Sequence, residues 1–295
     1  KINYQMSLNK DLTIIFVSFY SKNIIEKPIN QIDKEIPIIV VENSLDKDLK
    51  DKLEEKYSNV KVLIPEKNTG NGGGINVGLK EVKSKFVLYL DVDVELNNST
   101  IETLYNNTKK LDNFSILGPS IKNFPYKNEF YLDKNIIPGV HSMNFITGCA
   151  LFFNMKALNS IGFFDEKIFL YYEENDIYLR SLKKDFKILL IEAAEINHLG
   201  NSSTDLIQRN DIEINRNWHL MWSTFYFHNK HFGIIKAYEK TIFKFLSSFI
   251  KFIFFSVVQN HLKRKIYYAR MSGIFNAMIG KDSWFRSNIK NDIDN

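Results

Sequence analysis

Two aspartates spaced two residues apart follow an apolar run and could do metal chemistry. Residues 86–90 read Phe-Val-Leu-Tyr-Leu, and Asp91, Val92 and Asp93 come directly after them. An apolar run of this length predicts a buried strand, so the carboxylates should lie where that strand leaves its sheet. Ligands bind at this edge of open α/β sheets, and hard oxygen donors suit Mg²⁺ or Mn²⁺ bridging a diphosphate. The spacing fits equally well one aspartate that caps the next helix and one that faces water.

Three further side chains have types that suit the same chemistry. Glu173 and Glu174 stand at the start of an expected helix, where the helix dipole stabilises negative charge. Because the two are adjacent, they point in different directions and are expected to have different roles. Asp176 and Arg180 are four residues apart and can simply pair. His198 follows the last predicted strand on a polar, glycine-containing loop, and a lone histidine is more often a surface residue than a ligand.

A stretch rich in glycine and asparagine, residues 68–78, precedes the aspartates and includes Asn68, Gly70 and Asn76. Glycines before a helix let backbone N–H groups approach a phosphate at the positive end of the helix dipole. The stretch has neither G-x-G-x-x-G after the first strand nor G-K-[ST], which excludes Rossmann and P-loop assignments. A flexible connection is the alternative interpretation.

The elements that position these residues alternate between strand and helix. Charged amphipathic stretches predict helices at 46–57 and 98–111, and residues 121–143 are expected to form an irregular loop over the site. This order predicts an α/β fold with a mostly parallel mixed sheet flanked by helices. β-Branched and aromatic runs predict the strands 13–19, 36–41, 60–64, 86–90, 115–119, 145–153 and 187–191.

Strand patterns stop near residue 205, so we expect one domain over residues 1–205 and a helical region over 206–295. The aromatic stripe at 218–228 is expected to be core, with the floor of the acceptor site as the alternative. Residues 241–258 predict an apolar helix that carries one polar stripe, formed by Lys244, Ser247, Ser248 and Lys251. Such a helix can lie in a membrane interface, with the basic residues 261–265 on anionic head groups, or pack on another domain or subunit.

Composition narrows the class of protein. The chain has 295 residues, a net charge of +5 and 44% hydrophobic residues, which predicts a packed core. Its single cysteine, Cys149, excludes an internal disulfide framework and fits a reducing compartment. No paired Cys/His spacing indicates structural zinc. The first thirty residues lack the order of a signal peptide, and no uncharged stretch is long enough to span a bilayer.

Taken in order, these motifs resemble the family 2 glycosyltransferases of GT-A fold, and most closely their bacterial rhamnosyltransferase-like branch. The resemblance covers about residues 11–203, and its specificity lies in the full ordered series. The series comprises Val-Glu-Asn-Ser at 41–44, Asn68-x-Gly70, Gly74-x-Asn76-x-Gly78, Asp91-Val92-Asp93, Gly148-Cys149-Ala150, Phe164-Asp165-Glu166, Tyr172-Glu173-Glu174-Asn175-Asp176, Arg180 and His198-x-Gly200-x-Ser202.

The resemblance implies a role for each matching position. The pyrimidine base is expected to contact Ser18, Tyr20 and Glu42, and the family usually has aspartate at the position of Glu42. Small side chains near residues 148–149 can leave room for a sugar, although close backbone packing explains them equally well. The remaining residues expected to contact the nucleotide sugar are Asn43, Asn68, Gly70, Asn76, Asp91, Val92, Gly148 and Cys149.

The resemblance also implies the metal site and the base. Asp93, with Asp91, is expected to hold Mn²⁺ or Mg²⁺, and His198 to complete the site as a neutral imidazole ligand. Glu174 is expected to take the proton from the attacking hydroxyl, where relatives more often carry aspartate, with Glu173 as the alternative. One base candidate beside a metal cluster fits an inverting single displacement better than a mechanism with two opposed carboxylates.

We therefore expect an inverting, metal-dependent glycosyltransferase that moves rhamnose from dTDP-rhamnose to a lipid-linked or surface glycan, as in lipopolysaccharide assembly. A transferase of the same fold that uses UDP-galactofuranose or a UDP-hexosamine is one alternative. A sugar nucleotidyltransferase is another, although that class usually has a glycine-rich loop after the first strand and residues 19–22 have no glycine. A non-enzymatic membrane-binding module is the third.

The expected partners are a nucleotide sugar, a glycan acceptor, a membrane surface and a second copy of the chain through the C-terminal helices. Nucleic acid is not expected, because the basic C-terminal residues lie beside long apolar runs, which favours lipid. The expected location is the cytoplasm, peripherally on the inner face of the bacterial cytoplasmic membrane.

Overall fold

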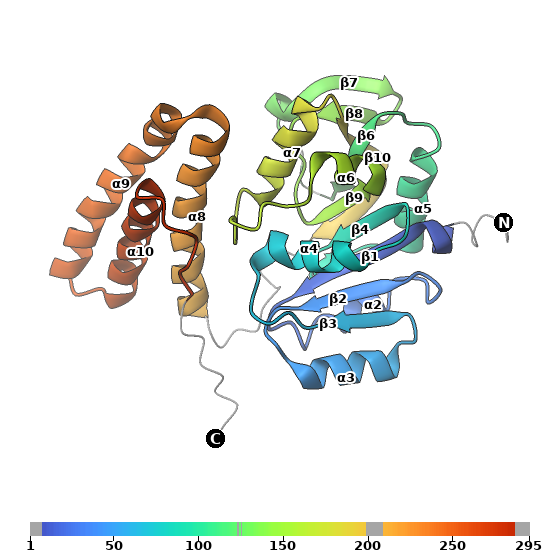
Figure 1. Cartoon of the computed structure of the whole chain (residues 1–295), viewed down its shortest axis with the longest axis horizontal. Helices are drawn as coiled ribbons and strands as arrows, with labels where there is room; N and C mark the ends of the chain where they lie inside the picture. The colour runs from blue at the N-terminus through green and yellow to red at the C-terminus, as the bar shows by residue number, and fades with distance from the viewer. Residues whose placement is uncertain (1–7, 123, 125, 199–208, 287–295) are drawn as a thin grey trace. The chain divides into compact units, whose positions relative to one another are not determined.

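A computed structural model of the chain describes residues 8–122, 124, 126–198 and 209–286, and they form two compact units (Figure 1). The larger unit holds the described residues as far as Phe164 and again from Glu174 to His198. The smaller unit holds Asp165–Glu173 and the described residues from 209 onward. The predicted domain boundary between residues 205 and 206 lies outside the described residues.

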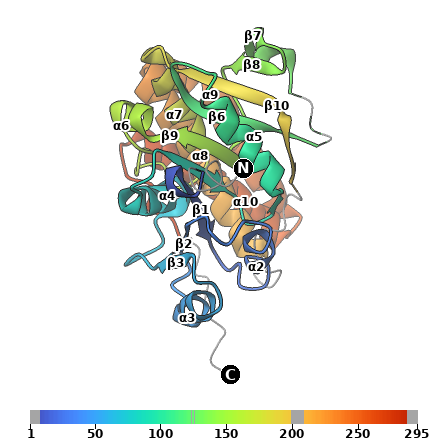
Figure 2. The ribbon, with the colours of Figure 1, turned by 90° about the vertical axis from the view of Figure 1, so that its right-hand side faces the viewer.

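Ten strands among the described residues form the sheet of the larger unit, in the order β3-β2-β1-β4-β9-β6-β10-β8-β7, with β5 paired to β10 (Figure 2). Strands β3, β2, β1 and β4 run parallel, whereas β9 is antiparallel to both of its neighbours. The strands are β1 (Leu12–Ser18), β2 (Ile38–Glu42), β3 (Val60–Leu63), β4 (Phe86–Leu90), β5 (Val94–Glu95), β6 (Phe114–Ile121), β7 (Tyr131–Ile137), β8 (Val140–Met143), β9 (Ala150–Asn154) and β10 (Lys187–His198).

Successive residues of a strand point to opposite sides of the sheet, and in the central strands both sets are apolar, so helices cover both faces. Ile14 and Phe16 of β1 pack in the cluster that includes residues of α2, α3 and α5. Ile15 packs in the other cluster, with residues of α4, α6 and α7. The helices are α2 (Glu26–Ile29), α3 (Lys47–Lys56), α4 (Gly70–Glu81), α5 (Asn98–Asn107), the 3₁₀ helix η1 (Asn128–Phe130), α6 (Met155–Ile161) and α7 (Glu173–Lys183).

The register of the parallel strands brings their carboxyl ends to one edge. Ser18 pairs with Glu42 across β1 and β2, and Phe16 pairs with Leu90 across β1 and β4. The segment after β4, which starts at Asp91, therefore lies at the same edge as the ends of β1 and β2. This mixed α/β sheet flanked by helices confirms the predicted fold class.

Three predictions about the second half of the sheet were wrong. The strand expected at 145–153 begins only at Ala150. Residues 121–143, expected to be irregular, contain β7 and β8, which pair as an antiparallel hairpin. Gly139 has a φ of 75° at the turn, a conformation that glycine adopts at little cost. Strand β7 is the edge of the sheet, where polar residues are tolerated, and the short β8 buries the polar His141 and Ser142, so neither shows an apolar strand pattern. Strand β10 continues to His198, seven residues beyond the predicted end at Ile191.

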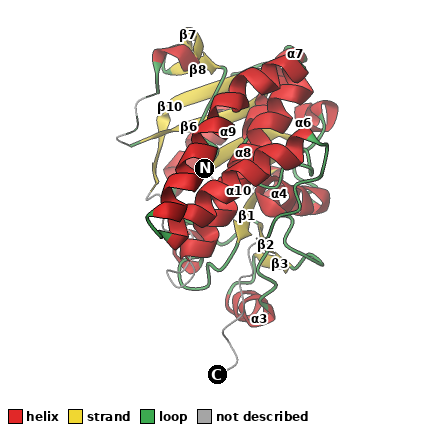
Figure 3. Cartoon of the chain, turned by 90° about the vertical axis from the view of Figure 1, so that its left-hand side faces the viewer, coloured by secondary structure: helices red, strands yellow, loops and turns green. Residues whose placement is uncertain are grey.

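The smaller unit contains α8 (Arg209–Phe232), α9 (Ile234–Val257) and α10 (His261–Met278), which pack against one another (Figure 3). Trp218 and Trp222 lie in its core, as predicted for the aromatic stripe. At Gly273 a Cβ would lie 2.3 Å from the carbonyl oxygen of Trp218, so glycine permits the close approach of α10 to α8. None of the described helices is long and apolar enough to cross a membrane.

The segment 165–173 is held to α8 by polar contacts. The Asp165 carboxylate accepts hydrogen bonds from the hydroxyl of Tyr226 at 2.8 Å and from Nζ of Lys230 at 2.7 Å. The Ser223 hydroxyl donates to the carbonyl oxygen of Leu170 at 2.9 Å. The smaller unit therefore includes residues that precede α7 in the chain.

Candidate active site

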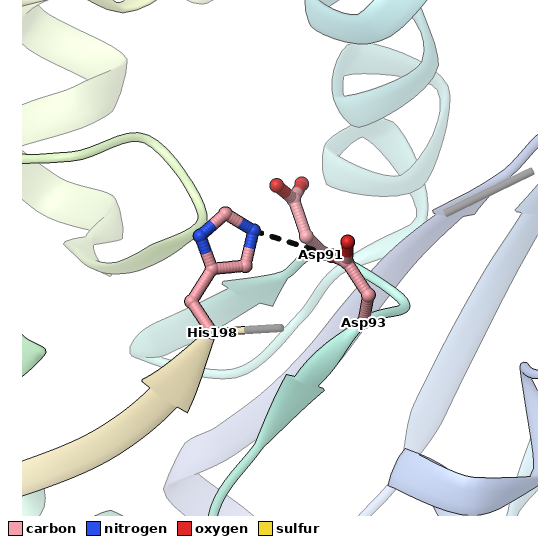
Figure 4. A group of neighbouring side chains, drawn as sticks. All are labelled: Asp91, Asp93 and His198. Atoms are coloured by element: carbon pink, nitrogen blue, oxygen red, sulfur yellow. Dashed lines mark ion pairs between the residues drawn. The ribbon is translucent and has the colours of Figure 1, made fainter. Parts of the chain in front are cut away.

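Asp91, Asp93 and His198 point toward one another at the carboxyl edge of the sheet (Figure 4). Nε2 of His198 lies 3.3 Å from Oδ1 of Asp93, and one ligand atom from each of the three residues lies within 4.8 Å of the others. The structure thus brings together the three predicted metal ligands, although His198 is more than a hundred residues from the aspartates in sequence.

A two-residue strand pairing positions the histidine. Strand β5 follows Asp93 directly, and its Val94 pairs with His198 in antiparallel register. Strand β10 can reach β5 because its register with β6 shifts between Ile191 and Glu195, where a bulge re-aims the strand. His198 therefore ends a strand and does not stand in a loop as predicted. Gly200 and Ser202 of the same motif lie outside the described residues.

The charges of the cluster fit a divalent cation. Burial raises the pKa of Asp91 to about 6, and the neighbouring charge of Asp93 adds to the increase. The hydrogen bond with Asp93 raises the pKa of His198. Carboxylate oxygens and an imidazole nitrogen are ligands that Mn²⁺ accepts, and a cation would relieve the repulsion between the two carboxylates. The residues present therefore fit a Mn²⁺ or Mg²⁺ ion.

Tyr89 is a member of the site that no sequence motif indicated. Its hydroxyl lies 2.5 Å from Oδ1 of Asp91 and 2.9 Å from Oδ1 of Asn71 in α4. Tyr89 and Asp91 are two residues apart along an extended chain, so their side chains face the same way, and this period could have identified the tyrosine. The contact links the glycine-rich helix to the aspartates. Val92, between the aspartates, packs its side chain in the hydrophobic core, which leaves its backbone for any contact with a ligand.

The glycine-rich stretch is tied to the end of β2 through Asn43. Nδ2 of Asn43 donates to the carbonyl oxygen of Gly70 at 2.8 Å, and its Oδ1 accepts from Oγ1 of Thr69 at 3.0 Å. Oδ1 of Asn68 accepts from the backbone N–H of Gly70 at 2.9 Å. A Cβ on Gly74 would lie 2.8 Å from Cγ1 of Val17 and 3.0 Å from Nδ2 of Asn43, so close packing requires this glycine. Contact of Asn43, Asn68 and Gly70 with a diphosphate stays a prediction.

Asn76 has a structural role. Its Nδ2 donates to the carbonyl oxygen of Phe164 at 2.9 Å, and its Oδ1 accepts from the backbone N–H of Phe164 at 3.0 Å. This pair of hydrogen bonds holds α4 to the segment after α6. The structure thus supplies a reason for Asn76 that does not involve a nucleotide.

The residues expected to hold the base gather beside β1 and β2. The Glu42 carboxylate is buried, which raises its pKa, and it accepts a hydrogen bond from the backbone N–H of Ser44 at 2.7 Å. Ser18 stands opposite Glu42 in the strand register. Tyr20 has a φ of 50°, and its backbone N–H donates to Oγ of Ser44 at 3.2 Å. Base recognition by Ser18, Tyr20 and Glu42 stays a prediction.

Glu174 lies against Gly148 in the larger unit. A Cβ on Gly148 would lie 2.1 Å from Oε1 of Glu174, so only glycine leaves space for this carboxylate. Burial raises the pKa of Glu174 to about 7, and the charge of Asp91 adds to the increase. Cys149 is buried, and its carbonyl oxygen accepts from the backbone N–H of Asp91 at 2.8 Å. The segment at Gly148 and Cys149 therefore contacts both the predicted base and the predicted metal ligand.

The two adjacent glutamates have different surroundings. Glu173 is buried and groups with the smaller unit, whereas Glu174 is partly exposed and groups with the sheet. Tyr171 and Tyr172, directly before them, have φ values of 66° and 70°, which non-glycine residues rarely adopt. This left-handed turn sets where α7 begins. The electrostatic interaction with Asp91 favours Glu174 as the base.

Arg180 fixes the segment that leads to α7. Its Nε donates to Oδ2 of Asp176 at 2.8 Å, which confirms the predicted pair. The rest of the guanidinium group, not anticipated from the sequence, donates to three backbone carbonyls, those of Ile161, Gly162 and Phe163.

The family model for Glycosyl transferase family 2 matches residues 20–174. A relative named low-salt glycan biosynthesis hexosyltransferase Agl10, from Haloferax volcanii, is 25% identical over 66% of this chain and 69% of its own length. An uncharacterized glycosyltransferase of Rickettsia typhi is also 25% identical and is matched over 92% of this chain and 93% of its own length.

Solved structures share the fold. The mannosyltransferase PcManGT from Pyrobaculum calidifontis, in complex with GDP-Man and Mn²⁺, has a TM-score of 0.55 at 9% identity over 94% of this chain and 93% of its own. Residues 1–349 of S. aureus TarS give 0.52 at 14% identity over 95% and 94%. GalNAc-T7 with UDP, GalNAc and Mn²⁺ gives 0.54 at 12% identity over 76% of this chain, which spans about half (52%) of that chain. The match to the family model and the shared GT-A fold agree, and this chain belongs to glycosyl transferase family 2.

Proposed function

We propose that this chain transfers a sugar from a nucleoside diphosphate to a hydroxyl group of a glycan, with a divalent metal ion and with inversion of the anomeric centre. The observation that carries the proposal is the cluster of Asp91, Asp93 and His198 at the carboxyl edge of the sheet. Glu174 interacts electrostatically with Asp91 and is available as a base. A metal cluster for the leaving group and one carboxylate for the incoming hydroxyl are the parts that a single displacement needs.

Asp91, Asp93 and His198 would hold the Mn²⁺ or Mg²⁺ ion, which neutralises negative charge on the departing diphosphate when it is bound. The hydroxyl of Tyr89 orients the Asp91 carboxylate through the contact at 2.5 Å. Glu174, with a pKa near 7, accepts the proton of the acceptor hydroxyl as that oxygen attacks the anomeric carbon. The bond to the sugar forms as the bond to the diphosphate breaks, so no covalent intermediate arises.

The donor in this proposal is a pyrimidine nucleotide sugar. Ser18, Tyr20 and the buried Glu42 would surround the base at the ends of β1 and β2. We propose dTDP-rhamnose as the first donor to test, with UDP-galactofuranose and a UDP-hexosamine as the next. The name of the Haloferax relative, a hexosyltransferase, supports a six-carbon sugar.

The acceptor in this proposal is a lipid-linked or surface glycan that is assembled at the cytoplasmic face of the membrane. The single cysteine, which is buried, fits a reducing compartment. Rhamnosyl transfer and polysaccharide assembly belong to the same proposal.

A donor screen tests the proposed function. The purified chain is mixed with each nucleotide sugar and Mn²⁺, and release of the nucleoside diphosphate and the shift in melting temperature are measured. We expect one pyrimidine nucleotide sugar to stabilise the protein and to be hydrolysed slowly without acceptor. Asp93→Ala should lose the hydrolysis, whereas Asp133→Ala, at an exposed carboxylate in β7, should keep it. Stabilisation by none of the donors, or equal hydrolysis by both variants, would contradict the proposal.

A further inference from the structure

The helix α9 exposes its large apolar side chains and buries a face of small ones. The exposed fractions of Ile235, Phe243, Ile250 and Val257 are 82%, 77%, 66% and 76%. Phe243, Ile250 and Val257 are seven residues apart, so they form one line along the helix. Further exposed apolar side chains of α9 are Ile242, Leu246, Phe249, Ile253 and Phe254.

The buried face of α9 is made of small side chains. Ala237, Thr241 and Ser248 are buried. The hydroxyl of Thr241 donates to the carbonyl oxygen of Ala237, and that of Ser248 donates to the carbonyl oxygen of Lys244, each at 2.7 Å. The hydroxyls are thus satisfied within the helix, and their small size lets α9 pack closely on its neighbours. Of the polar stripe predicted from the sequence, only Ser248 is buried in this face, whereas Lys244, Ser247 and Lys251 are exposed, as are the large apolar residues named above.

Basic side chains border the exposed apolar face. Nζ of Lys251 lies 5.3 Å from the ring centre of Tyr267, and Nζ of Lys263 lies 5.0 Å from that of Phe255. The rings of Phe255 and Tyr267 stack on each other, so the two ammonium groups are held beside one α9–α10 contact. On α10, Arg264 and Lys265 line a cavity of about 610 Å³ that also includes Phe252 of α9.

Residues 234–278, which include α9 and α10, carry almost only positive charge. Residues 234–278 contain a single acidic side chain, Glu239, and eight basic ones. The basic residues are Lys236, Lys240, Lys244, Lys251, Lys263, Arg264, Lys265 and Arg270. Because the whole chain has a net charge of +5, its positive charge is concentrated on these two helices. An apolar face bordered by positive charge complements the apolar interior and the anionic phosphates of a phospholipid surface.

We propose that the face of α9 formed by Phe243, Ile250 and Val257 docks on an anionic lipid bilayer, with Lys251 and Lys263 near the lipid phosphates. No described helix can cross a membrane, so α9 would lie in the plane of the interface. A second copy of the chain fits the face less well, because a symmetric contact would bring like-charged borders together. Vesicle binding needs no nucleotide sugar, so this proposal stands or fails independently of the transfer reaction.

Sedimentation with vesicles tests the docking. The full chain is incubated with vesicles of phosphatidylcholine alone, or with roughly a third phosphatidylglycerol, at low and high salt. We expect binding to the anionic vesicles that weakens as salt rises. Phe243→Glu with Ile250→Glu should weaken binding at least ~10-fold, because it places charge on the apolar face that would enter the lipid. The control Phe124→Glu with Leu132→Glu makes the same charge change at exposed residues of the larger unit and should bind like the unaltered chain.

A second pair of variants tests the basic border. Lys251→Gln with Lys263→Gln should weaken binding to anionic vesicles several-fold and reduce its dependence on salt. Lys110→Gln with Lys122→Gln, at exposed positions of the larger unit, has the same change of charge and should leave binding unchanged. Unaltered melting temperatures would show that every variant is folded.

Two results would overturn the proposal. One is equal sedimentation of the unaltered chain and the Phe243→Glu, Ile250→Glu variant. The other is a stable dimer of the unaltered chain in analytical ultracentrifugation, lost in the variant, together with no binding of the unaltered chain to vesicles. That second result would assign the face to a contact between copies.

Discussion

Glu174 occupies the space that a side chain on Gly148 would need, since a Cβ there would lie 2.1 Å from Oε1 of Glu174. Gly148→Ala should therefore displace the carboxylate. We expect kcat to fall at least ~10-fold with a small change in the donor KM, because the proposed base is displaced while the proposed metal ligands keep their places. Steady-state kinetics measures this split.

A double variant separates displacement of Glu174 from general damage at the site. If Gly148→Ala acts through Glu174, then adding it to Glu174→Gln should reduce kcat little further. Losses that multiply in the double variant would show that Gly148 contributes to catalysis by another route.

The pH dependence of transfer should follow the protonation of Glu174. Its pKa is raised to about 7, and the base must be deprotonated, so kcat should rise with pH and level off above neutral pH. The negative charge of Asp91 raises the pKa of Glu174, and a cation bound near Asp91 would lower it again. The midpoint of the pH profile is therefore expected at or below 7. The profile is measured with saturating metal and donor. A profile for Glu174→Gln that keeps the same midpoint and height would move the base to another residue.

His219 should make the stability of the chain depend on pH. It is buried in α8. Its Nε2 lies 2.9 Å from the carbonyl oxygen of Phe285, so that nitrogen carries the proton of the neutral ring. Its Nδ1 accepts a hydrogen bond from the hydroxyl of Ser283 at 3.0 Å. Burial lowers the pKa of His219 to about 3, and the charge of Arg286 adds to the decrease. The folded protein thus binds the second proton, the one that makes the imidazole of His219 positively charged, more weakly than the unfolded chain does.

The sign of the effect follows from this difference. The contribution of His219 is fully present above the unfolded pKa of about 6.5 and is lost as pH falls from there toward 3, by up to about 1.4 kcal/mol per pH unit. Urea unfolding at several pH values should therefore show a steeper acid loss in the unaltered chain than in His219→Gln. Parallel curves for the two proteins would exclude a buried neutral histidine.

Arg180→Lys should destabilise the chain because an ammonium group cannot reproduce the fork that bonds Asp176 and three backbone carbonyls. Asp176 is fully buried, so a weakened partner leaves its charge poorly compensated. We expect a loss of about 2–4 kcal/mol in the free energy of unfolding, measured with urea. A loss below about 0.5 kcal/mol would show that the segment is held by other contacts.

Sequence patterns predicted the central strands because each of them is buried on both faces and therefore apolar throughout. Strands β1 and β4 are of this kind. Strand β7 escaped prediction because a strand at the edge of a sheet needs fewer apolar residues, and β8 escaped because it is short and two of its four buried residues, His141 and Ser142, are polar. The polar half of β10 escaped for a different reason: after a shift in register it pairs with the end of β6, and its last two residues pair with β5, and no local pattern encodes these pairings.

The candidate site was predicted as a set of residues and not as an arrangement. Motif order identified Asp91, Asp93, Glu174 and His198, but the contact of Glu174 with Gly148 depends on chain folding between distant segments. The orientation of α9 shows a related limit. Its helical period was visible in the sequence. The face turned inward is set by the small size of Ala237, Thr241 and Ser248, which the pattern of polar residues did not reveal.

Metal-dependent transfer at Asp91, Asp93 and His198 is tested most directly by titrating Mn²⁺ into the chelator-treated protein with its donor and following release of the nucleoside diphosphate. We predict no release without metal, saturable recovery for the unaltered chain, and recovery for Asp93→Ala that is weaker by at least ~100-fold, since a ligand to the ion is lost. Full release in the presence of chelator, or the same titration curve for Asp93→Ala, would contradict the assignment of these three residues as the metal site.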